Sequence, residues 1–393
     1  MNKVWFYVTT VWRSIIVTTI AAVGIIMMLF FQLGSLPGGF HAREVTTNNS
    51  HVSFSNIIQQ PLDAPFYTLR AIGHRLHPGS GILVNRVAAA SFGFFVVVAF
   101  YALLRSWYSL RVAALGSILL ASSSWFLRVG RIGLPDILQA TVIVFVTLVV
   151  WFQKTKLRKT AALLITLTAA ILLYIPGLVW IVILGFVWRG KTVVKEMNDL
   201  PRLLVVGYYF LTLLLISPLV LALIRTPSIS TQLIGLPPHF QVAHFVSNLI
   251  HLPSWLFIKA KSDPVLFIGR QPLLDIFTSF MVILGLYNVL LDIKLDRSKL
   301  TLGLLVIGVT VSCLRDDGLL SPLLVPVFLL ATAGIAYMLD EWFRVFPRNP
   351  LARSIAAILV SVAVLLTIFY HVTNYFIAWP NAPATRATFT HQV

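Results

Sequence analysis

Charged residues are scarce in this chain, because Asp, Glu, Lys and Arg together make up only 11% of its 393 residues. Proteins use these four residues at about a quarter of all positions on average, largely to keep the surface in contact with water. The apolar fraction is 58% and the mean hydropathy is +0.89. This composition excludes an ordinary soluble globular protein.

Only one cysteine is present, and the sequence contains no internal repeat and no low-complexity tract. The single Cys313 excludes an intramolecular disulfide and any cysteine-rich metal site. It lies in an apolar run, so packing is its expected role. The missing repeat disfavours a transporter or lipid flippase, because many such proteins are built from inverted repeats.

Acidic residues are few, with 13 Asp and Glu against 30 Lys and Arg, and the formal net charge is +17. Such an excess indicates nucleic-acid binding when the basic residues gather on one face. Here they are spread through short loops between apolar blocks, which is typical of membrane topology. We therefore expect membrane lipids, and no nucleic acid, among the partners.

The apolar residues come in blocks of about 20, the length that spans a bilayer core of roughly 30 Å. Backbone groups in that core must be satisfied within the segment, so the blocks are predicted to be helices. We predict an all-α polytopic membrane protein with about eleven transmembrane helices. The expected spans are 14–34, 82–104, 110–127, 134–153, 159–174, 176–188, 201–224, 271–292, 298–314, 318–340 and 351–375.

Short basic loops between the predicted spans indicate the orientation. With the N-terminus in the cytoplasm, the basic stretches at 154–159, 189–202, 294–299 and 344–353 all lie inside, as the positive-inside rule requires. The C-terminus is then outside, and the expected location is the cell (plasma) membrane. The first apolar block is longer than the roughly 7–15 residues of a signal-peptide core, so it is predicted to be retained.

Two loops on the predicted outer side are long, 35–81 and 225–270. The first contains PLDAPFYTLRAIGHRLHP, in which aromatic and aliphatic residues recur at helical spacing with arginine and histidine between them. This pattern predicts an amphipathic helix on the membrane surface. We expect residues 1–393 to form a single transmembrane domain without a separate soluble domain at the C-terminus.

The sequence contains no compact set of metal ligands. His239, His244 and His251 are loosely spaced and do not have the i, i+4 pairing of a helical zinc site. The adjacent Asp316 and Asp317 carry the oxygen ligands that divalent cations prefer, but a metal site needs several converging ligands. We therefore expect no bound metal and no cofactor.

Four segments, in order along the chain, resemble one family of membrane enzymes. They are LPGGFHAREV, QPLDAPFYTL, NRVAAASFGFFVVVAFYALLRSWYSLRVAALGSILLASSSWFLRVGRIGLPDIL and DPVLFIGRQPLLDIFTSFMVILGLY. Their order and spacing over most of the chain resemble the bacterial C-type (GT-C) glycosyltransferases, which include protein O-mannosyltransferases and aminoarabinose transferases. No single motif is specific, so the resemblance rests on the ordered series.

The resemblance implies a polyprenyl-phosphate sugar as donor, inversion at the anomeric carbon, and an outer-loop carboxylate as base. A hydroxyl needs such a carboxylate within about 3 Å to lose its proton as it attacks. By position, Glu44 matches the second acid of the family's Asp-Glu pair and is a predicted base, while Arg43 replaces the first acid. Arg43 beside Glu44 would keep it ionised. The alternative is a loop salt bridge from Glu44 to Arg43 or Arg70.

Asp136 matches the acidic residue that the family places before its fourth helix, and it is the second predicted catalytic residue. The alternative is a helix-start acid favoured by the helix dipole. Asp63 lies between two prolines and is expected either to begin a helix or to contact the acceptor. Arg43 is a second candidate for contact with the acceptor.

The departing lipid phosphate needs cations to stabilise its charge. Arg315 lies where related enzymes carry a basic residue before a proline-containing helix, so it is the leading candidate for phosphate binding. Arg128 and Arg131, one helical turn apart, either bind the phosphate or anchor at the membrane interface. Lys261 and Arg270 in the second long loop are weaker candidates for the same role.

These features favour a membrane hexosyl- or pentosyltransferase that acts on a glycan, lipid or protein acceptor at the outer face. A transporter or lipid flippase is the alternative, although the charged residues collect at the predicted outer surface and not in mid-membrane. A third hypothesis is a GT-C-like scaffold that has lost activity. It is supported by Arg43, which stands in place of the family's acid.

Overall fold

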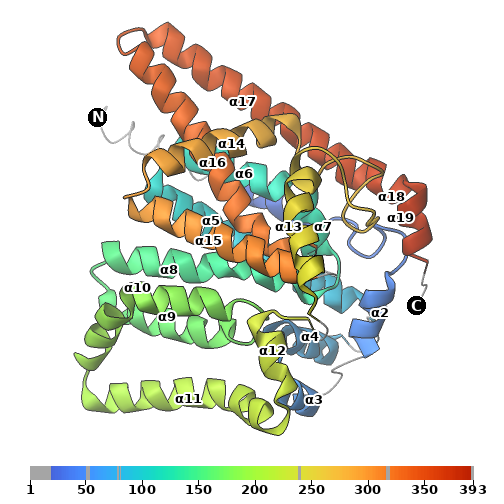
Figure 1. Cartoon of the computed structure of the whole chain (residues 1–393), viewed down its shortest axis with the longest axis vertical. Helices are drawn as coiled ribbons and strands as arrows, with labels where there is room; N and C mark the ends of the chain where they lie inside the picture. Colours follow the sequence, from blue (N-terminus) through green and yellow to red (C-terminus); the bar gives the residue numbers. More distant parts are fainter. Residues whose placement is uncertain are drawn as a thin grey trace, which may run out of the picture.

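The computed structural model describes residues 19–49, 54–77, 79, 81–237, 240–315 and 319–390. Regular structure in these ranges is helical, with no strand. Long helices lie side by side across the molecule, and shorter helices gather at one end of them (Figure 1). The chain is therefore an all-α polytopic membrane protein, as the apolar blocks predict.

The first described helix is Thr19–Phe30. The elements after it are α2 (Ala42–Asn49), α3 (Phe54–Gln59), α4 (Ala64–Leu76), α5 (Leu83–Trp107), α6 (Leu110–Ser122), α7 (Ser124–Arg131), η1 (Pro135–Thr141), α8 (Val142–Lys154), α9 (Arg158–Leu172), α10 (Val179–Asn198), α11 (Arg202–Arg225), α12 (Ser228–Ile234), α13 (Val242–Phe257), α14 (Ile276–Leu291), α15 (Asp296–Leu314), α16 (Ser321–Val345), α17 (Pro350–Thr373), η2 (Asn374–Ala378), α18 (Trp379–Asn381) and α19 (Pro383–Thr388).

Among the described residues, six helices are long and apolar enough to cross a bilayer, and the bent pair α6–α7 makes a seventh. The expected count of eleven is not confirmed. One expected span, 110–127, is broken at Ser123, where α6 and α7 meet at 59°. Another, α9, has 15 residues, which at 1.5 Å per residue is about 22 Å and shorter than the bilayer core.

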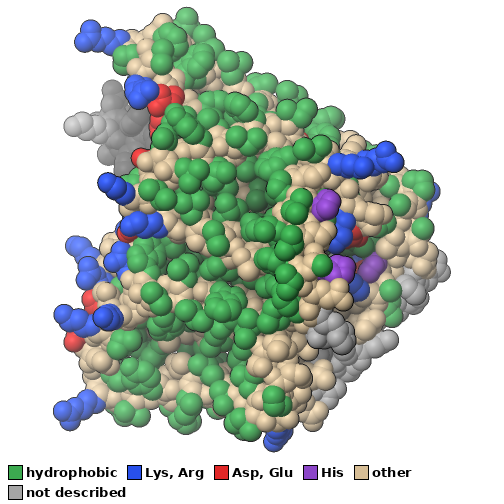
Figure 2. Space-filling view, in the orientation of Figure 1, with side chains coloured by type: hydrophobic (Ala, Val, Ile, Leu, Met, Phe, Trp, Pro, Cys, Tyr) green, Lys and Arg blue, Asp and Glu red, His purple; other side chains and the backbone are tan. Residues whose placement is uncertain are grey.

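The two ends of the helix bundle differ in composition. Lys and Arg side chains gather along the end that carries the α8–α9, α10–α11, α14–α15 and α16–α17 connections, which we call the basic end (Figure 2). The opposite end carries α2, α3, α4, α12 and the C-terminal turns (Figure 1), and we call it the loop end. The positive-inside rule predicts that the basic end faces the cytoplasm.

Helices α14 and α16 cross at two glycines. A Cβ atom added to Gly285 would lie 1.8 Å from the Leu330 carbonyl oxygen, and one added to Gly334 would lie 2.0 Å from the Met281 carbonyl oxygen. Small residues at such crossings let two membrane helices approach until their backbones touch. The absence of a side chain at these two positions therefore sets the distance between the helices.

Gly334→Ala is expected to destabilise the protein by about 1–3 kcal/mol, because the new methyl group forces the two backbones apart. Thermal unfolding of the purified protein in detergent measures the effect as a lower midpoint. Gly207→Ala in α11 is the matched control, since a Cβ there meets no atom within 4 Å. Equal midpoints for the two variants would contradict the close crossing.

Candidate active site

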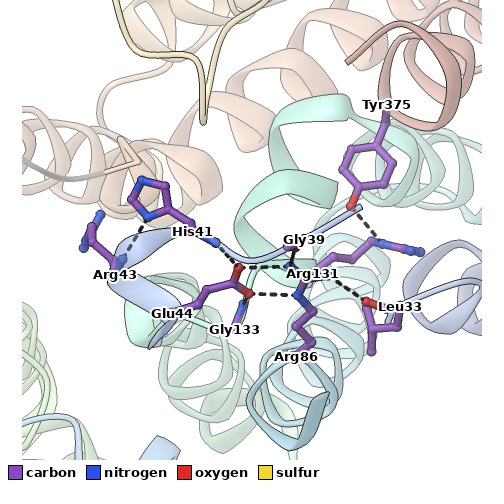
Figure 3. Close-up of polar contacts among 9 residues, drawn as sticks. All are labelled: Leu33, Gly39, His41, Arg43, Glu44, Arg86, Arg131, Gly133 and Tyr375. Atoms are coloured by element: carbon purple, nitrogen blue, oxygen red, sulfur yellow. Dashed lines mark hydrogen bonds and ion pairs between the residues drawn. The ribbon is translucent and has the colours of Figure 1, made fainter. Parts of the chain in front are cut away.

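The side chains of Glu44 and His41 cap the start of α2 through hydrogen bonds with the backbone. The His41 backbone N–H donates to Glu44 Oε2 at 3.0 Å, and the Arg43 backbone N–H donates to His41 Nδ1 at 3.1 Å (Figure 3). A glutamate at the third helical position that reaches back to the residue before the helix is half of a capping box. The sequence HARE therefore fixes where the helix starts and where Glu44 points.

The Glu44 carboxylate is fully buried in an ion pair with Arg86 of α5, which is also fully buried. Arg86 Nε donates to Oε1 at 2.8 Å and Arg86 Nη2 donates to Oε2 at 3.0 Å, while the Gly133 backbone N–H donates to Oε1 at 2.8 Å (Figure 3). Four donors thus satisfy the two carboxylate oxygens. This environment is that of a structural salt bridge, with Arg86 in place of the expected Arg43 or Arg70.

Arg86 also holds the loop before α2. Its guanidinium donates to the Leu33 carbonyl at 3.1 Å and to the Gly39 carbonyl at 2.7 Å, and it lies 4.6 Å from the centre of the Phe40 ring. Arg86 is not among the residues that the sequence pattern selects. The available signal was an arginine four residues into an apolar helix, a position where an unpaired charge is costly.

Arg128 and Arg131 are buried in α7 and bind other parts of the protein. Arg131 donates to the Tyr375 hydroxyl at 3.0 Å (Figure 3). It also donates to the Met28 and Phe31 carbonyls. Arg128 donates to Asn374 Oδ1 at 2.6 Å and to the Leu266 carbonyl. These bonds hold the C-terminal turns and the helix Thr19–Phe30 against α7. The guanidinium groups of Arg128 and Arg131 therefore stabilise the packing of the fold.

Lys261 and Arg270 are exposed on the connection between α13 and α14. The Lys261 ammonium lies 5.1 Å from the centre of the Trp255 ring. Phosphate binding by these two residues stays a prediction.

Three charged side chains from distant segments meet at the loop end, Arg43, Asp136 and Arg315. Asp63 lies near enough for its carboxyl to be affected by the charges of Asp136 and Arg315, and we call the four residues the charged cluster. Asp136 lies in the first turn of η1 and its side chain is 1% exposed. Arg43 Nη2 lies 3.2 Å from Asp136 Oδ2, and Arg315 Nη2 lies 3.7 Å from Asp136 Oδ1. The Asp136 carboxyl thus lies between two guanidinium groups, each of which keeps part of its surface exposed.

Asp63 is the second carboxylate of the charged cluster. It precedes α4 with the left-handed backbone conformation φ 56°, and its N–H donates to the Tyr174 carbonyl at 2.8 Å. Burial raises the pKa of its carboxyl to about 7, because the nearby positive charge of Arg315 only partly offsets burial and the negative charge of Asp136 adds to it. This carboxyl therefore exchanges its proton near neutral pH.

Arg43 stands where the family carries an acid, and the structure gives it a partner in the charged cluster. The guanidinium brings positive charge to Asp136 at the point where the family pattern predicts negative charge. The four residues of the charged cluster are two of the predicted site residues, Asp136 and Arg315, and both loop candidates, Arg43 and Asp63. The role of each in catalysis stays a prediction.

No group of three or more His, Cys, Asp or Glu side chains is arranged to hold a metal ion in the part of the chain that the structure describes. Asp316, Asp317 and His239 lie outside the described residues. The expectation that no metal is bound stays a prediction.

The fold of this chain is similar to those of several proteins of known structure. ArnT from Cupriavidus metallidurans, in its structure bound to undecaprenyl phosphate, matches with a TM-score of 0.57 and 13% identity over 94% of this chain and 77% of ArnT. Its apo state matches with a TM-score of 0.56 over 97% of this chain. The Archaeoglobus fulgidus oligosaccharyltransferase in the apo form matches with a TM-score of 0.57 and 12% identity over 92% of this chain and 55% of the oligosaccharyltransferase.

The chain shares the fold of these two proteins. Both similar proteins are GT-C glycosyltransferases, so the resemblance of the ordered segments to this superfamily is confirmed at the level of fold. No protein-family model and no curated protein matches the sequence. At 12–13% identity, the match establishes a shared fold, and the chemistry has to be argued from the site.

Proposed function

We propose that this protein is a membrane glycosyltransferase that moves a sugar from a polyprenyl-phosphate donor to an acceptor hydroxyl. The charged cluster carries the proposal, because it places two carboxylates and two arginines together at one end of a GT-C fold. The similar ArnT structure contains undecaprenyl phosphate, a lipid phosphate of the kind that the proposed reaction releases.

The cluster supplies both charges that the reaction needs. Guanidinium groups bind phosphate oxygens through charge-assisted hydrogen bonds, and they stabilise the negative charge that grows on the departing phosphate. A carboxylate accepts the proton of the acceptor hydroxyl while the hydroxyl oxygen attacks the anomeric carbon. Attack from the face opposite the phosphate inverts that carbon.

The location and partners follow from the same proposal. The protein would lie in the plasma membrane with the N-terminus in the cytoplasm, so that the loop end faces outward. Its substrates would be a lipid-linked hexose or pentose and a glycan, lipid or protein acceptor, and no metal or cofactor would be required. The second reading, a GT-C scaffold without activity, is favoured only by Arg43 in place of the family's acid.

The proposal predicts that the purified protein binds a polyprenyl phosphate and that Arg315→Gln weakens this binding at least tenfold. One lost charge-assisted contact to phosphate is worth about 1.5–3 kcal/mol, which is a factor of ten or more. Titration of the protein in nanodiscs with undecaprenyl phosphate measures the Kd. Arg344→Gln is the control, because Arg344 lies in the last turn of α16, before the α16–α17 connection, and pairs there with Glu341.

Donor consumption directly tests the proposal that the protein is an active glycosyltransferase. The wild-type protein is incubated with a panel of polyprenyl-phosphate sugars, and release of the free lipid phosphate is followed by chromatography. We expect one donor class to be consumed in the presence of a suitable acceptor. Binding of the lipid phosphate without consumption of any donor would favour the inactive scaffold, and absence of both would overturn the proposal.

A further inference from the structure

The two carboxylates of the charged cluster are held in different ways. Asp136 has an arginine next to each of its oxygens, at 3.2 and 3.7 Å, and its side chain is 1% exposed. Among the described residues, none donates a hydrogen bond to the carboxyl of Asp63, which is half-buried and does not cap α4. The two arginines and the burial of its side chain leave an acceptor hydroxyl little access to Asp136, whereas neither arginine is paired with the Asp63 carboxyl.

We infer that Asp63 is the base that takes the proton of the acceptor hydroxyl, and that Asp136 positions Arg43 and Arg315 for the phosphate. This inference rests on the proposed function. It assigns the catalytic role to a residue that the family pattern does not select, and it gives Asp136 the role of a positioning residue.

The backbone around Asp63 is built to hold this side chain in place. Pro61 and Pro65 restrict the chain on both sides, and the Asp63 N–H is fixed on the Tyr174 carbonyl at 2.8 Å. The residue itself adopts φ 56°, a conformation that Asp and Asn tolerate better than most other residues. The carboxyl at the start of α4 is thus held within electrostatic reach of Arg315 and Asp136.

The charges of the cluster match the proton transfer. The acceptor oxygen forms a bond to the anomeric carbon and its proton passes to the Asp63 carboxylate. The bond from that carbon to the phosphate oxygen breaks, and its electron pair stays on the phosphate beside Arg43 and Arg315. Proton acceptance is most efficient when the pKa of the base lies near the operating pH, and burial places the Asp63 carboxyl there.

Asp63→Asn tests the inference, because Asn keeps the size of the side chain and tolerates the left-handed backbone. We expect kcat for sugar transfer to fall at least 100-fold, while the Kd for undecaprenyl phosphate stays within threefold of the wild-type value. We also expect wild-type kcat/KM to rise about tenfold per pH unit below pH 7 and to level off above pH 7. Any residual activity of Asp63→Asn should not show this rise with pH.

The outcomes separate the inference from the proposed function. If the wild-type protein consumes no donor, the proposed function fails. If the wild-type protein is active and Asp63→Asn retains more than a third of its kcat, Asp63 is not the base, although the protein is still a glycosyltransferase. The wild-type pH profile does not depend on any variant folding, and a profile that is flat from pH 5 to 8 overturns the inference.

Discussion

Glu44→Gln is expected to lower the free energy of unfolding by about 3–5 kcal/mol, because it leaves the buried Arg86 guanidinium without its countercharge. Arg86 is fully buried, and its Nε and Nη2 groups both donate to the Glu44 carboxylate. The amide of Gln offers one acceptor in place of two charged oxygens. The unfolding midpoint in detergent should drop, or the variant should fail to accumulate in folded form.

A double replacement and an exposed pair serve as controls. Glu44→Gln combined with Arg86→Gln should cost less than the sum of the two single changes, since the double variant leaves no unpaired charge. Glu196→Gln, which breaks the exposed pair with Arg158 at the basic end, should change the free energy of unfolding by less than about 1 kcal/mol. A Glu44→Gln variant that folds like the wild type and loses sugar transfer would instead identify Glu44 as the base.

The sequence predicts the membrane-spanning architecture because that signal is local. An apolar block of bilayer length has few alternatives to a helix, and the ordered resemblance to GT-C enzymes adds the arrangement. The exact spans are harder to predict from hydropathy. The bend at Ser123 separates α6 from α7 inside one apolar stretch, and neither proline nor glycine marks it.

The candidate site could be predicted only in part, because each contact in it joins distant segments. Asp136 and Arg315 were selected from their places beside predicted helices, and the structure brings them together. The pairing of Glu44 with Arg86 depends on how α2 packs against α5, and no sequence spacing encodes it. Arg128 and Arg131 show the same limit, since their partners lie in the last turns of the chain and beside other helices.

Asp63 was a minor candidate in the sequence because its local pattern, an acid between two prolines, is that of an ordinary helix start. Its distinctive property arises only after folding. Burial and two neighbouring charges decide the protonation of this carboxyl, and these neighbours lie 73 and 252 residues further along the chain. Perturbed acids of this kind cluster at functional sites, so the tertiary environment carries the information that the sequence does not.

Asp136→Asn and Arg315→Gln are expected to shift the pH dependence of sugar transfer in opposite directions. The negative charge of Asp136 raises the pKa of Asp63, so its removal should shift the rising limb of kcat/KM to lower pH. The positive charge of Arg315 lowers that pKa, so its removal should shift the limb to higher pH. Each shift should be on the order of one pH unit, as for a single charge beside a carboxyl.

Arg315→Gln should also lower kcat by roughly 100- to 1,000-fold, because the departing phosphate loses a donor that stabilises its growing charge. Asp292→Asn is the matched control, since Asp292 follows α14 directly and pairs with Arg297 in the first turn of α15, so that this change should affect neither kcat nor the pH profile. Initial rates of transfer from pH 5 to 9 measure both effects. Two shifts in the same direction would contradict the role of Asp63, because opposite charges around one titrating carboxyl must shift its pKa in opposite directions.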